Sequence, residues 1–190
     1  MHKLSDQELS FKVAAYQDSD AFAELYQRYF ALLQKFIYFR ISAKEDAEDL
    51  ANQVFLDVWE YLTTKGVKET WNTRAFLYKV TRNQIANFYR AKGRTPFQVE
   101  LDKVGEYGDY LDIADERADL LQSYLSNQDK DRVIEAVQKL PEPYREVIAL
   151  KFFEELHIQE IAEVIGKSEG NIRVIIYRGK QMLKNIIKTP

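Results

Sequence analysis

Residues 74–94 read RAFLYKVTRNQIANFYRAKGR, and the periodicity of this stretch predicts an amphipathic helix. At about 100° per residue, one side of the helix that it predicts carries Leu77, Val80, Thr81, Gln84, Ile85 and Phe88. The opposite side carries Lys79, Arg82, Asn83, Ala86 and Arg90, with Asn87 at its border. A helix with an apolar back and a front of Arg and Asn is suited to phosphates and base edges. An ordinary amphipathic helix with a solvated side would show the same pattern, so the rest of the chain must distinguish the two.

Charge is concentrated in two parts of a chain whose net charge is only −3. Residues 63–94 carry a net charge of +7 and residues 165–190 one of +5, while residues 95–131 between them carry −7. Two basic segments separated by an acidic one are typical of two contact surfaces for one polyanion. Within the acidic segment we expect a linker over 97–112 and a helix over 113–126; a merely solvated tether is the simpler interpretation.

The rest of the pattern is helical, and no segment alternates apolar and polar residues as a strand would. Capping boxes are expected where Ser5 precedes Glu8 and where Ser42 precedes Glu45. Gly66 interrupts the helical pattern after the third helix, and a loop is expected over 67–73. The expected helices are 5–16, 21–40, 43–62, 74–93, 131–140, 144–156, 158–165 and 169–187. The predicted fold class is therefore all-α.

Two short helices near the C-terminus are joined by a tight turn, which is the pattern of a helix-turn-helix. Gly166 can take the positive φ that ends the first helix, and Ser168 is a good N-cap for the second. The second helix, over 169–187, shows outward the polar and basic set of Asn171, Arg173, Val174, Tyr177, Arg178 and Lys180. A basic outer side suits entry into the major groove, although a helical hairpin that binds no DNA would share the apolar pattern.

Composition limits the chemistry of which the chain is capable. Its 190 residues are enough for one ordinary domain or two small ones, and it contains no cysteine. The polar start, MHKLSDQELSFK, and the lack of a long apolar window predict neither a signal peptide nor membrane insertion. His2 and His157 are isolated, and the acidic residues of 45–49 point in different directions on a helix. We therefore expect no catalytic site, no metal and no cofactor.

The helix over 43–62 has an unusual polar side. Its core stripe consists of Ala47, Leu50, Ala51, Val54 and Val58. The opposite side is acidic and amide-rich, yet three apolar residues lie in it or beside it: Phe55, Leu56 and Trp59. Apolar side chains within an acidic side suggest docking to a basic, apolar partner. Packing of these three residues inside a three-helix domain is the other interpretation.

Two pairs of segments resemble the extracytoplasmic-function sigma factors. EDAEDLANQVFLDVWEYL, followed by RAFLYKVTRNQIANFYRAKGR, resembles their region-two domain. LPEPYREVIALKFFEEL, followed by EIAEVIGKSEGNIRVIIYRGKQML, resembles their region-four domain. The resemblance implies a region-two domain over 1–95, an acidic linker over 96–130 and a region-four helix-turn-helix domain over 131–190. It also implies a bacterial cytoplasmic protein without enzymatic activity whose partners are core RNA polymerase, promoter DNA and an anti-sigma factor.

The resemblance and the side-chain pattern together assign residues to each contact. The residues expected at the minus-ten element and in strand melting are Trp71, Asn72, Phe76, Lys79, Arg82, Asn83, Asn87 and Arg90. Those expected at the minus-thirty-five element are Ser168, Glu169, Asn171, Arg173, Val174, Tyr177, Arg178 and Lys180. Those expected to bind core polymerase are Asp46, Glu48, Asp49, Leu50, Gln53, Phe55, Leu56 and Trp59. From its own chemistry, Trp71 fits either capture of a base or a place in the core.

The chain departs from the family pattern at several positions. Phe76 replaces the usual Trp, Asn87 replaces a frequent Asp, and Asn171 replaces a common Thr. Ile175 stands where a basic residue is common, and Gly179 stands where Ala is common. These departures bear on the promoter sequence that is recognised and not on the class of protein. The alternatives are an autonomous helix-turn-helix regulator that binds an operator as a dimer, and a helical adaptor whose basic sides bind acidic proteins.

Overall fold

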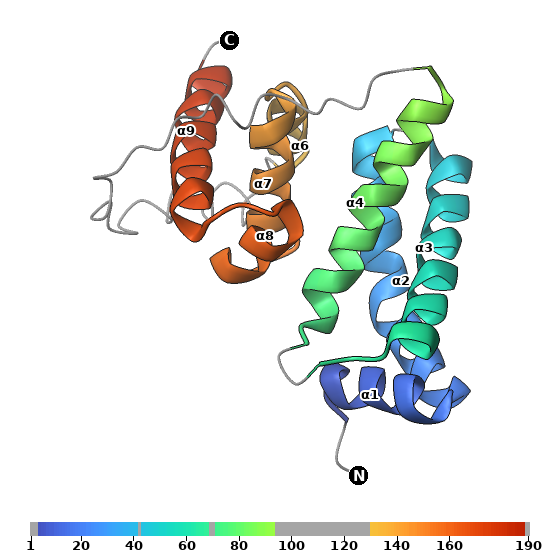
Figure 1. The fold of residues 1–190 in the computed structure, drawn as a ribbon. Helices are drawn as coiled ribbons and strands as arrows, with labels where there is room; N and C mark the ends of the chain where they lie inside the picture. The colour runs from blue at the N-terminus through green and yellow to red at the C-terminus, as the bar shows by residue number, and fades with distance from the viewer. Residues whose placement is uncertain (1–3, 42, 69–70, 94–129, 189–190) are drawn as a thin grey trace. The chain divides into compact units, whose positions relative to one another are not determined.

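The part of the chain that the computed structural model describes is residues 4–41, 43–68, 71–93 and 130–188. All regular structure in that part is α-helical, which confirms the all-α fold class (Figure 1). The chain divides into two compact units, residues 1–96 and 97–190. The predicted linker over 97–112 and the predicted helix over 113–126 lie outside the described residues.

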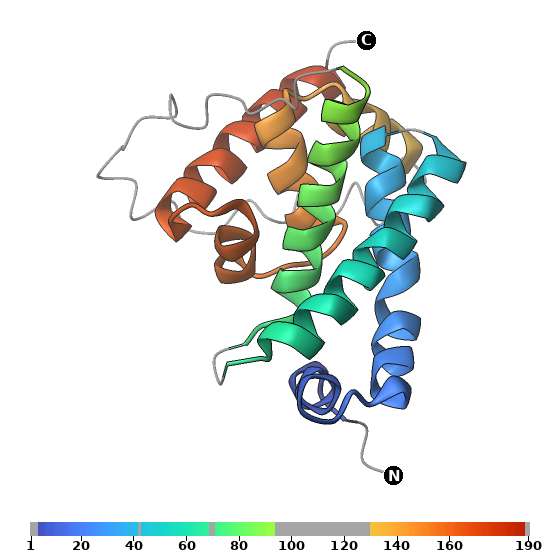
Figure 2. The ribbon, with the colours of Figure 1, turned by 45° about the vertical axis from the view of Figure 1, so that its right-hand side comes forward.

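Four helices form the N-terminal unit: α1 (Asp6–Tyr16), α2 (Ser19–Ile41), α3 (Lys44–Lys65) and α4 (Thr73–Ala91). Helices α2, α3 and α4 pack on one another, and α1 lies across one end of them, as Figures 1 and 2 both show. Phe36 of α2 and Tyr78 of α4 are buried and meet edge to face, with ring centroids 5.4 Å apart. The apolar stripes that the sequence places on α3 and α4 face this core, which includes Ala47, Ala51, Val54, Val58, Leu77 and Ile85.

Side-chain caps set the start of the first two helices. The predicted capping box of α1 is confirmed, because Ser5 Oγ accepts from Glu8 N at 3.2 Å and Glu8 Oε2 accepts from Ser5 N at 2.7 Å. Asp18 caps α2, since its Oδ1 accepts a hydrogen bond from Ala21 N at 2.9 Å. This cap starts α2 at Ser19, two residues before the expected start.

Helix α3 differs from the prediction at both ends. Its N-cap is Ala43, which makes no side-chain cap bond, so the expected box of Ser42 with Glu45 does not open the helix; Ser42 itself lies outside the described residues. At the other end α3 continues past residue 62 to Lys65. In this last turn the hydroxyls of two threonines donate to carbonyls of the preceding turn, so they are bonded within the helix.

Four helices form the C-terminal unit: α6 (Lys130–Gln138), α7 (Glu142–Phe152), α8 (Ile158–Ile165) and α9 (Glu169–Lys188). Helices α8 and α9 form the predicted helix-turn-helix. Gly166 ends α8 at φ 75°, and Ser168 Oγ accepts from Asn171 N at 3.3 Å in the first turn of α9. The α8 side of the motif is buried through Ile161, Ala162, Val164 and Ile165.

Helix α7 is displaced along the sequence relative to the expected helix over 144–156. It begins at Glu142 because Pro143 fits the first turn of a helix, where a missing N–H leaves no hydrogen bond unmade. It ends at Phe152, since Glu155 has a φ of 53°, which no α-helix allows. The turn before α8 therefore takes up the residues that the periodicity had assigned to the end of α7.

Candidate nucleic-acid and docking surfaces

The loop before α4 ends in a cap that uses one of the predicted DNA contacts. Asn72 is the N-cap of α4, and its Oδ1 accepts a hydrogen bond from Ala75 N at 2.9 Å. The next residue, Thr73, is buried at the first position of the helix. Asn72 thus fixes the direction in which the loop enters α4, and it also lies at the position that the resemblance assigns to the minus-ten element.

Three aromatic rings form a cluster, here called the α3–α4 aromatic cluster, at the start of α4. Trp71 stacks on Tyr61 with centroids 5.7 Å apart and lies 4.5 Å from the ring of Phe76. Trp71 Nε1 is buried and has no hydrogen-bond partner among the described residues. Tyr61, from the last turns of α3, remains 39% exposed and lies 4.6 Å from Phe76. Trp71 is thus half-buried inside a stack, and the ring that the cluster exposes most is Tyr61.

Tyr61 is a member of the cluster that helical periodicity alone does not predict. Tyr61 lies five residues after Leu56 on the same helix, and the prediction ended that helix at 62. Because Tyr61 lies in the last predicted turn of that helix, only the return of the chain at Trp71 shows that Tyr61 belongs to the cluster. Aromatic rings of this kind stack on unpaired bases with little sequence preference.

The outer side of α4 is basic and open. Lys79, Asn83, Asn87 and Arg90 are exposed, and Arg82 is half-buried. The helix contains no acidic residue, so no carboxylate of its own opposes a phosphate. The structure thus places these five predicted residues on one continuous helix, on the side away from the buried stripe.

The outer side of α9 presents the second predicted surface. Arg173 and Tyr177 are exposed, and Arg173 Nη2 pairs with Glu169 Oε2 at 3.2 Å. This pair between two exposed side chains is screened by water and readily exchanged for a phosphate. Asn171, Val174, Arg178 and Lys180 are half-buried beside them.

The inner side of α9 is held close to α7. Gly179 is buried, and a Cβ built on it would lie 2.9 Å from Ile148 Cγ1. Lys180 Nζ lies 5.2 Å from the ring centroid of Phe152. The missing side chain at position 179 therefore sets the distance between the two helices, and with it the position of the exposed side of α9.

The polar side of α3 divides into residues that are open and one that is not. Leu56 is 63% exposed between charged and amide side chains, and Glu48, Asp49 and Gln53 are exposed with it. Phe55 is only 3% exposed. Its assignment to the polymerase contact is therefore corrected: the packing interpretation holds for Phe55.

Rings from α2 explain why Phe55 is covered. Tyr26 lies 4.7 Å from Phe55, and Phe22 and Phe30 lie 6.0 and 6.2 Å away between centroids. Phe22 also contacts Trp59 at 5.0 Å, which leaves Trp59 half-buried at the edge of the same stack. Among the three apolar residues of the polar side of α3, only Leu56 is fully available to a partner.

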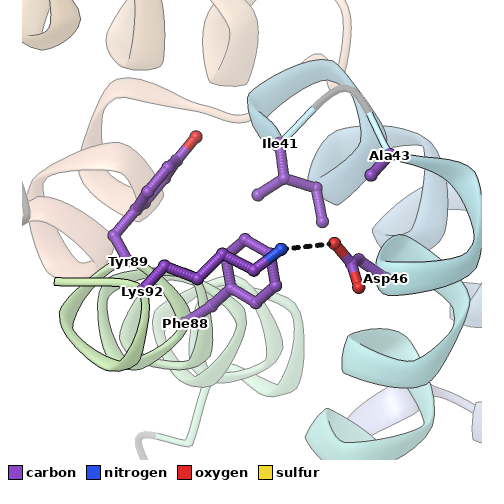
Figure 3. Close-up of a pocket in the computed structure, with 6 residues that line it drawn as sticks. All are labelled: Ile41, Ala43, Asp46, Phe88, Tyr89 and Lys92. Atoms are coloured by element: carbon purple, nitrogen blue, oxygen red, sulfur yellow. Dashed lines mark hydrogen bonds and ion pairs between the residues drawn. The ribbon is translucent and has the colours of Figure 1, made fainter. Parts of the chain in front are cut away.

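Asp46, at the start of α3, is paired within the unit. Its Oδ2 lies 2.8 Å from Lys92 Nζ, and that amine also lies 4.1 Å from the ring centroid of Phe88 (Figure 3). These residues line a shallow pocket of about 420 Å³ together with Ile41, Ala43 and Tyr89. The ion pair partly neutralises Asp46, so a partner that contacts this carboxylate must compete with Lys92.

Among the described residues, no three His, Cys, Asp or Glu side chains come together as a metal site requires. None of the helices in that part of the chain is both long and apolar enough to cross a membrane.

Comparison with known proteins gives two family matches in chain order. The family model "Sigma-70 region 2" matches residues 25–95, and "Sigma-70, region 4" matches residues 130–183. The ECF RNA polymerase sigma factor BldN of Streptomyces coelicolor is 30% identical over 173 residues, which cover 90% of this chain and 61% of the relative. The ECF RNA polymerase sigma factor SigW of Bacillus subtilis is 24% identical over 173 residues, which cover 90% of this chain and 91% of the relative.

A solved structure supports the fold. The sigma factor RpoE in complex with the anti-sigma factor NepR, from Bartonella quintana, matches with a TM-score of 0.61 at 20% identity. The match covers 88% of this chain and 97% of that chain. Both halves of the chain therefore match sigma-70 regions in the expected order, and its relatives are sigma factors. The chain belongs to the sigma-70 family of RNA polymerase sigma factors, in the extracytoplasmic-function group.

Proposed function

We propose that this chain is a sigma factor that binds core RNA polymerase and directs promoter recognition, DNA melting and transcription initiation. The observation that carries the proposal is the presence of two basic helical surfaces, on α4 and on α9, in two separate units. An autonomous operator-binding regulator needs only the second surface. The function of an autonomous regulator would leave the basic side of α4 and the exposed Leu56 of α3 without a role.

The two surfaces would take different parts of a promoter. Arg173 and Arg178 on α9 have the donors that read guanine edges in the major groove, so α9 is assigned to the minus-thirty-five element. The α3–α4 aromatic cluster and the basic side of α4 are assigned to the minus-ten element. There, Tyr61 and Trp71 supply stacking for unpaired bases, and Lys79 and Arg90 supply charge for the backbone.

The partners of the chain follow from the same proposal. Core RNA polymerase is assigned to the polar side of α3, where Leu56 is surrounded by carboxylate and amide groups. An anti-sigma factor is proposed as a second protein partner, because a structurally similar sigma factor was solved in such a complex. We infer that the chain acts in the bacterial cytoplasm, where core polymerase resides, and that it catalyses no reaction by itself.

The experiment is co-purification of the chain with core RNA polymerase from its own organism, followed by a Leu56→Glu variant. This substitution places a charge in the proposed contact, so we expect the affinity for core polymerase to fall by at least about 2 kcal/mol. Leu32→Glu is the matched control, because Leu32 is also exposed (41%) but lies on α2. Circular dichroism must show that both variants keep the helical content of the wild type.

The outcomes separate the alternatives. Loss of binding by Leu56→Glu but not by Leu32→Glu supports the docking surface on α3. Wild-type affinity of a folded Leu56→Glu variant removes this surface from the mechanism. Failure of the wild-type chain to bind core polymerase, together with tight operator-specific DNA binding by the free protein, would favour the autonomous regulator instead.

A further inference from the structure

Helix α1 lies outside the residues, 25–95, that match the region-two family model, yet it is bonded to the first residue of α4. Thr73 Oγ1 donates to the carbonyl oxygen of Asp6 at 3.0 Å, and Ser10 Oγ lies 2.8 Å from Thr73 Oγ1. A threonine hydroxyl has one proton, which Thr73 gives to Asp6, so Ser10 must be the donor to Thr73. Ser10 is completely buried and Thr73 is 4% exposed, so water cannot replace either partner.

The other end of this hydrogen-bond chain is fixed on α2. The Asp6 carboxylate accepts from Arg28 Nη1 at 2.6 Å and from the hydroxyl of Tyr29. Arg28 Nη2 also donates to the carbonyl oxygen of Leu4 at 2.8 Å, just before α1. Burial, with the adjacent Asp6 carboxylate, raises the pKa of Tyr29 above its usual value, so the phenol stays protonated and keeps donating. Asp6 therefore joins α2 through its side chain to α4 through its backbone.

The residue that α1 holds is next to the residues assigned to the minus-ten element. Thr73 directly follows Trp71 and Asn72, and Asn72 caps the helix that Thr73 begins. Apolar packing is not directional, whereas hydrogen bonds prefer a narrow range of distances and angles. The two bonds to Thr73 thus fix the rotation and height of the first turn of α4, and through it the position of the loop end.

We propose that α1 is a clamp on the start of α4, and that Ser10 and Thr73 are positioning residues for promoter opening. The inference rests on the proposed function as a sigma factor. Neither hydroxyl reaches the solvent, so neither contacts DNA. Each acts through Asn72 and the α3–α4 aromatic cluster, which receive unpaired bases only when the start of α4 is held in place.

The test compares promoter opening by holoenzymes that carry Thr73→Val, Thr73→Ser or Ser10→Ala. Wild-type holoenzyme is first used to find one genomic fragment that gives a run-off transcript with core polymerase of the same organism. Opening of that fragment is then followed by permanganate reactivity of unpaired thymines. The same fragment with a mismatched bubble over the melted region serves as a template that requires no opening.

Thr73→Val keeps the shape of the side chain but removes both hydrogen bonds, and we expect opening of the duplex to slow about tenfold. Thr73→Ser keeps the hydroxyl and should stay within about twofold of the wild type. Ser10→Ala removes one bond and should lie between them. Transcription from the bubble template should be nearly the same for all three variants.

Thr81→Val is the matched control. Thr81 is also completely buried on α4, but its hydroxyl donates to Leu77 O at 2.8 Å within the same helix. Its loss should lower stability without slowing opening, because no bond to α1 is broken. If Thr81→Val slows opening as much as Thr73→Val does, the effect is general destabilisation and the clamp is refuted.

Two further results would overturn the proposal. One is wild-type opening by a folded Thr73→Val or Ser10→Ala holoenzyme. The other is an equal loss on duplex and bubble templates, which would mean that the hydroxyls serve folding or polymerase binding alone. Failure of the sigma-factor proposal itself looks different, because the wild-type holoenzyme then gives no transcript from any fragment.

Discussion

Addition of one methyl group at Gly179 should destabilise the C-terminal unit, although alanine is the better helix former. Gly179 is buried on α9, where the chain faces α7. A Cβ at this position would lie 2.9 Å from Ile148 Cγ1, 3.2 Å from Ile148 Cδ1 and 3.5 Å from Tyr144 Cβ. Non-bonded carbon atoms prefer separations of about 3.5–4.0 Å, so two of these three contacts are too short.

The magnitude follows from two opposing effects. Alanine in place of glycine within a helix stabilises it by about 0.5–1 kcal/mol. Overpacking in a well-packed core costs about 1–3 kcal/mol, and Ile148 is completely buried, so its atoms have little room to move. We expect Gly179→Ala to lower the free energy of unfolding of this unit by about 1 kcal/mol, the difference between these effects.

Gly170→Ala is the matched control on the same helix. A Cβ at Gly170 would meet only Ser168 Oγ, at 4.0 Å, so the substitution should stabilise the helix by up to about 1 kcal/mol. Ile148→Ala makes room for the added methyl group. The cost of the double variant Gly179→Ala/Ile148→Ala should therefore be less than the sum of the two single costs.

Urea unfolding can assign the change to one unit. Both tryptophans, Trp59 and Trp71, lie in the N-terminal unit, so their fluorescence reports only that unit, while far-ultraviolet circular dichroism reports both. Gly179→Ala should lower the urea midpoint of the transition that circular dichroism detects and fluorescence does not. The midpoint of the fluorescence transition should stay unchanged. A higher midpoint for the C-terminal unit would show that helix propensity outweighs the short contacts, and would refute the reasoning.

Three other outcomes can be measured. Trp71→Ala should change base preference at the minus-ten element and Arg173→Ala at the minus-thirty-five element, each by about 1–3 kcal/mol per lost contact, in transcription from single-base promoter variants; identical changes for both would contradict the assignment. The backbone amide of Ala21 lowers the pKa of Asp18, so the stability from this carboxylate is present above its unfolded pKa of 3.8 and is lost as the pH falls through the lower folded value. Urea midpoints of Asp18→Asn should therefore depend less on pH in that range than those of the wild type. Glu155→Gly should raise the free energy of unfolding of the C-terminal unit by up to about 1 kcal/mol, because glycine adopts the φ of 53° without strain. An unchanged or lower urea midpoint for this unit would contradict this.

Helical periodicity is sufficient to predict the sides of α4 and α9. Leu77 and Ile85 are buried and Lys79 and Asn83 are exposed, as a period of about 3.6 residues requires. The turn of the helix-turn-helix can also be predicted from the sequence, because Gly166 favours the positive φ that ends α8. These features depend on neighbours in the sequence, which is why the sequence alone is enough.

The composition of the polar side of α3 needs information from other helices. Periodicity places Phe55 beside Leu56 and cannot tell that Phe22, Tyr26 and Phe30 of α2 cover one and not the other. The same holds for Thr73, whose burial depends on α1 more than sixty residues earlier in the chain. The burial of both residues depends on tertiary packing, which cannot be predicted from the neighbouring residues in the sequence.

The division of the basic residues between two units has a consequence for binding under the proposed function. Each surface can neutralise only a few phosphates. The logarithm of the binding constant falls with the logarithm of the salt concentration, with a slope of about −0.9 for each neutralised phosphate. Each unit by itself should therefore bind DNA weakly at physiological salt. Polymerase that holds both units at a fixed spacing converts the second contact into an intramolecular event, which multiplies the affinity without any new contact. The exposed side of α3 matters for this reason: a free chain carries both DNA surfaces, but only a docked chain can use them together.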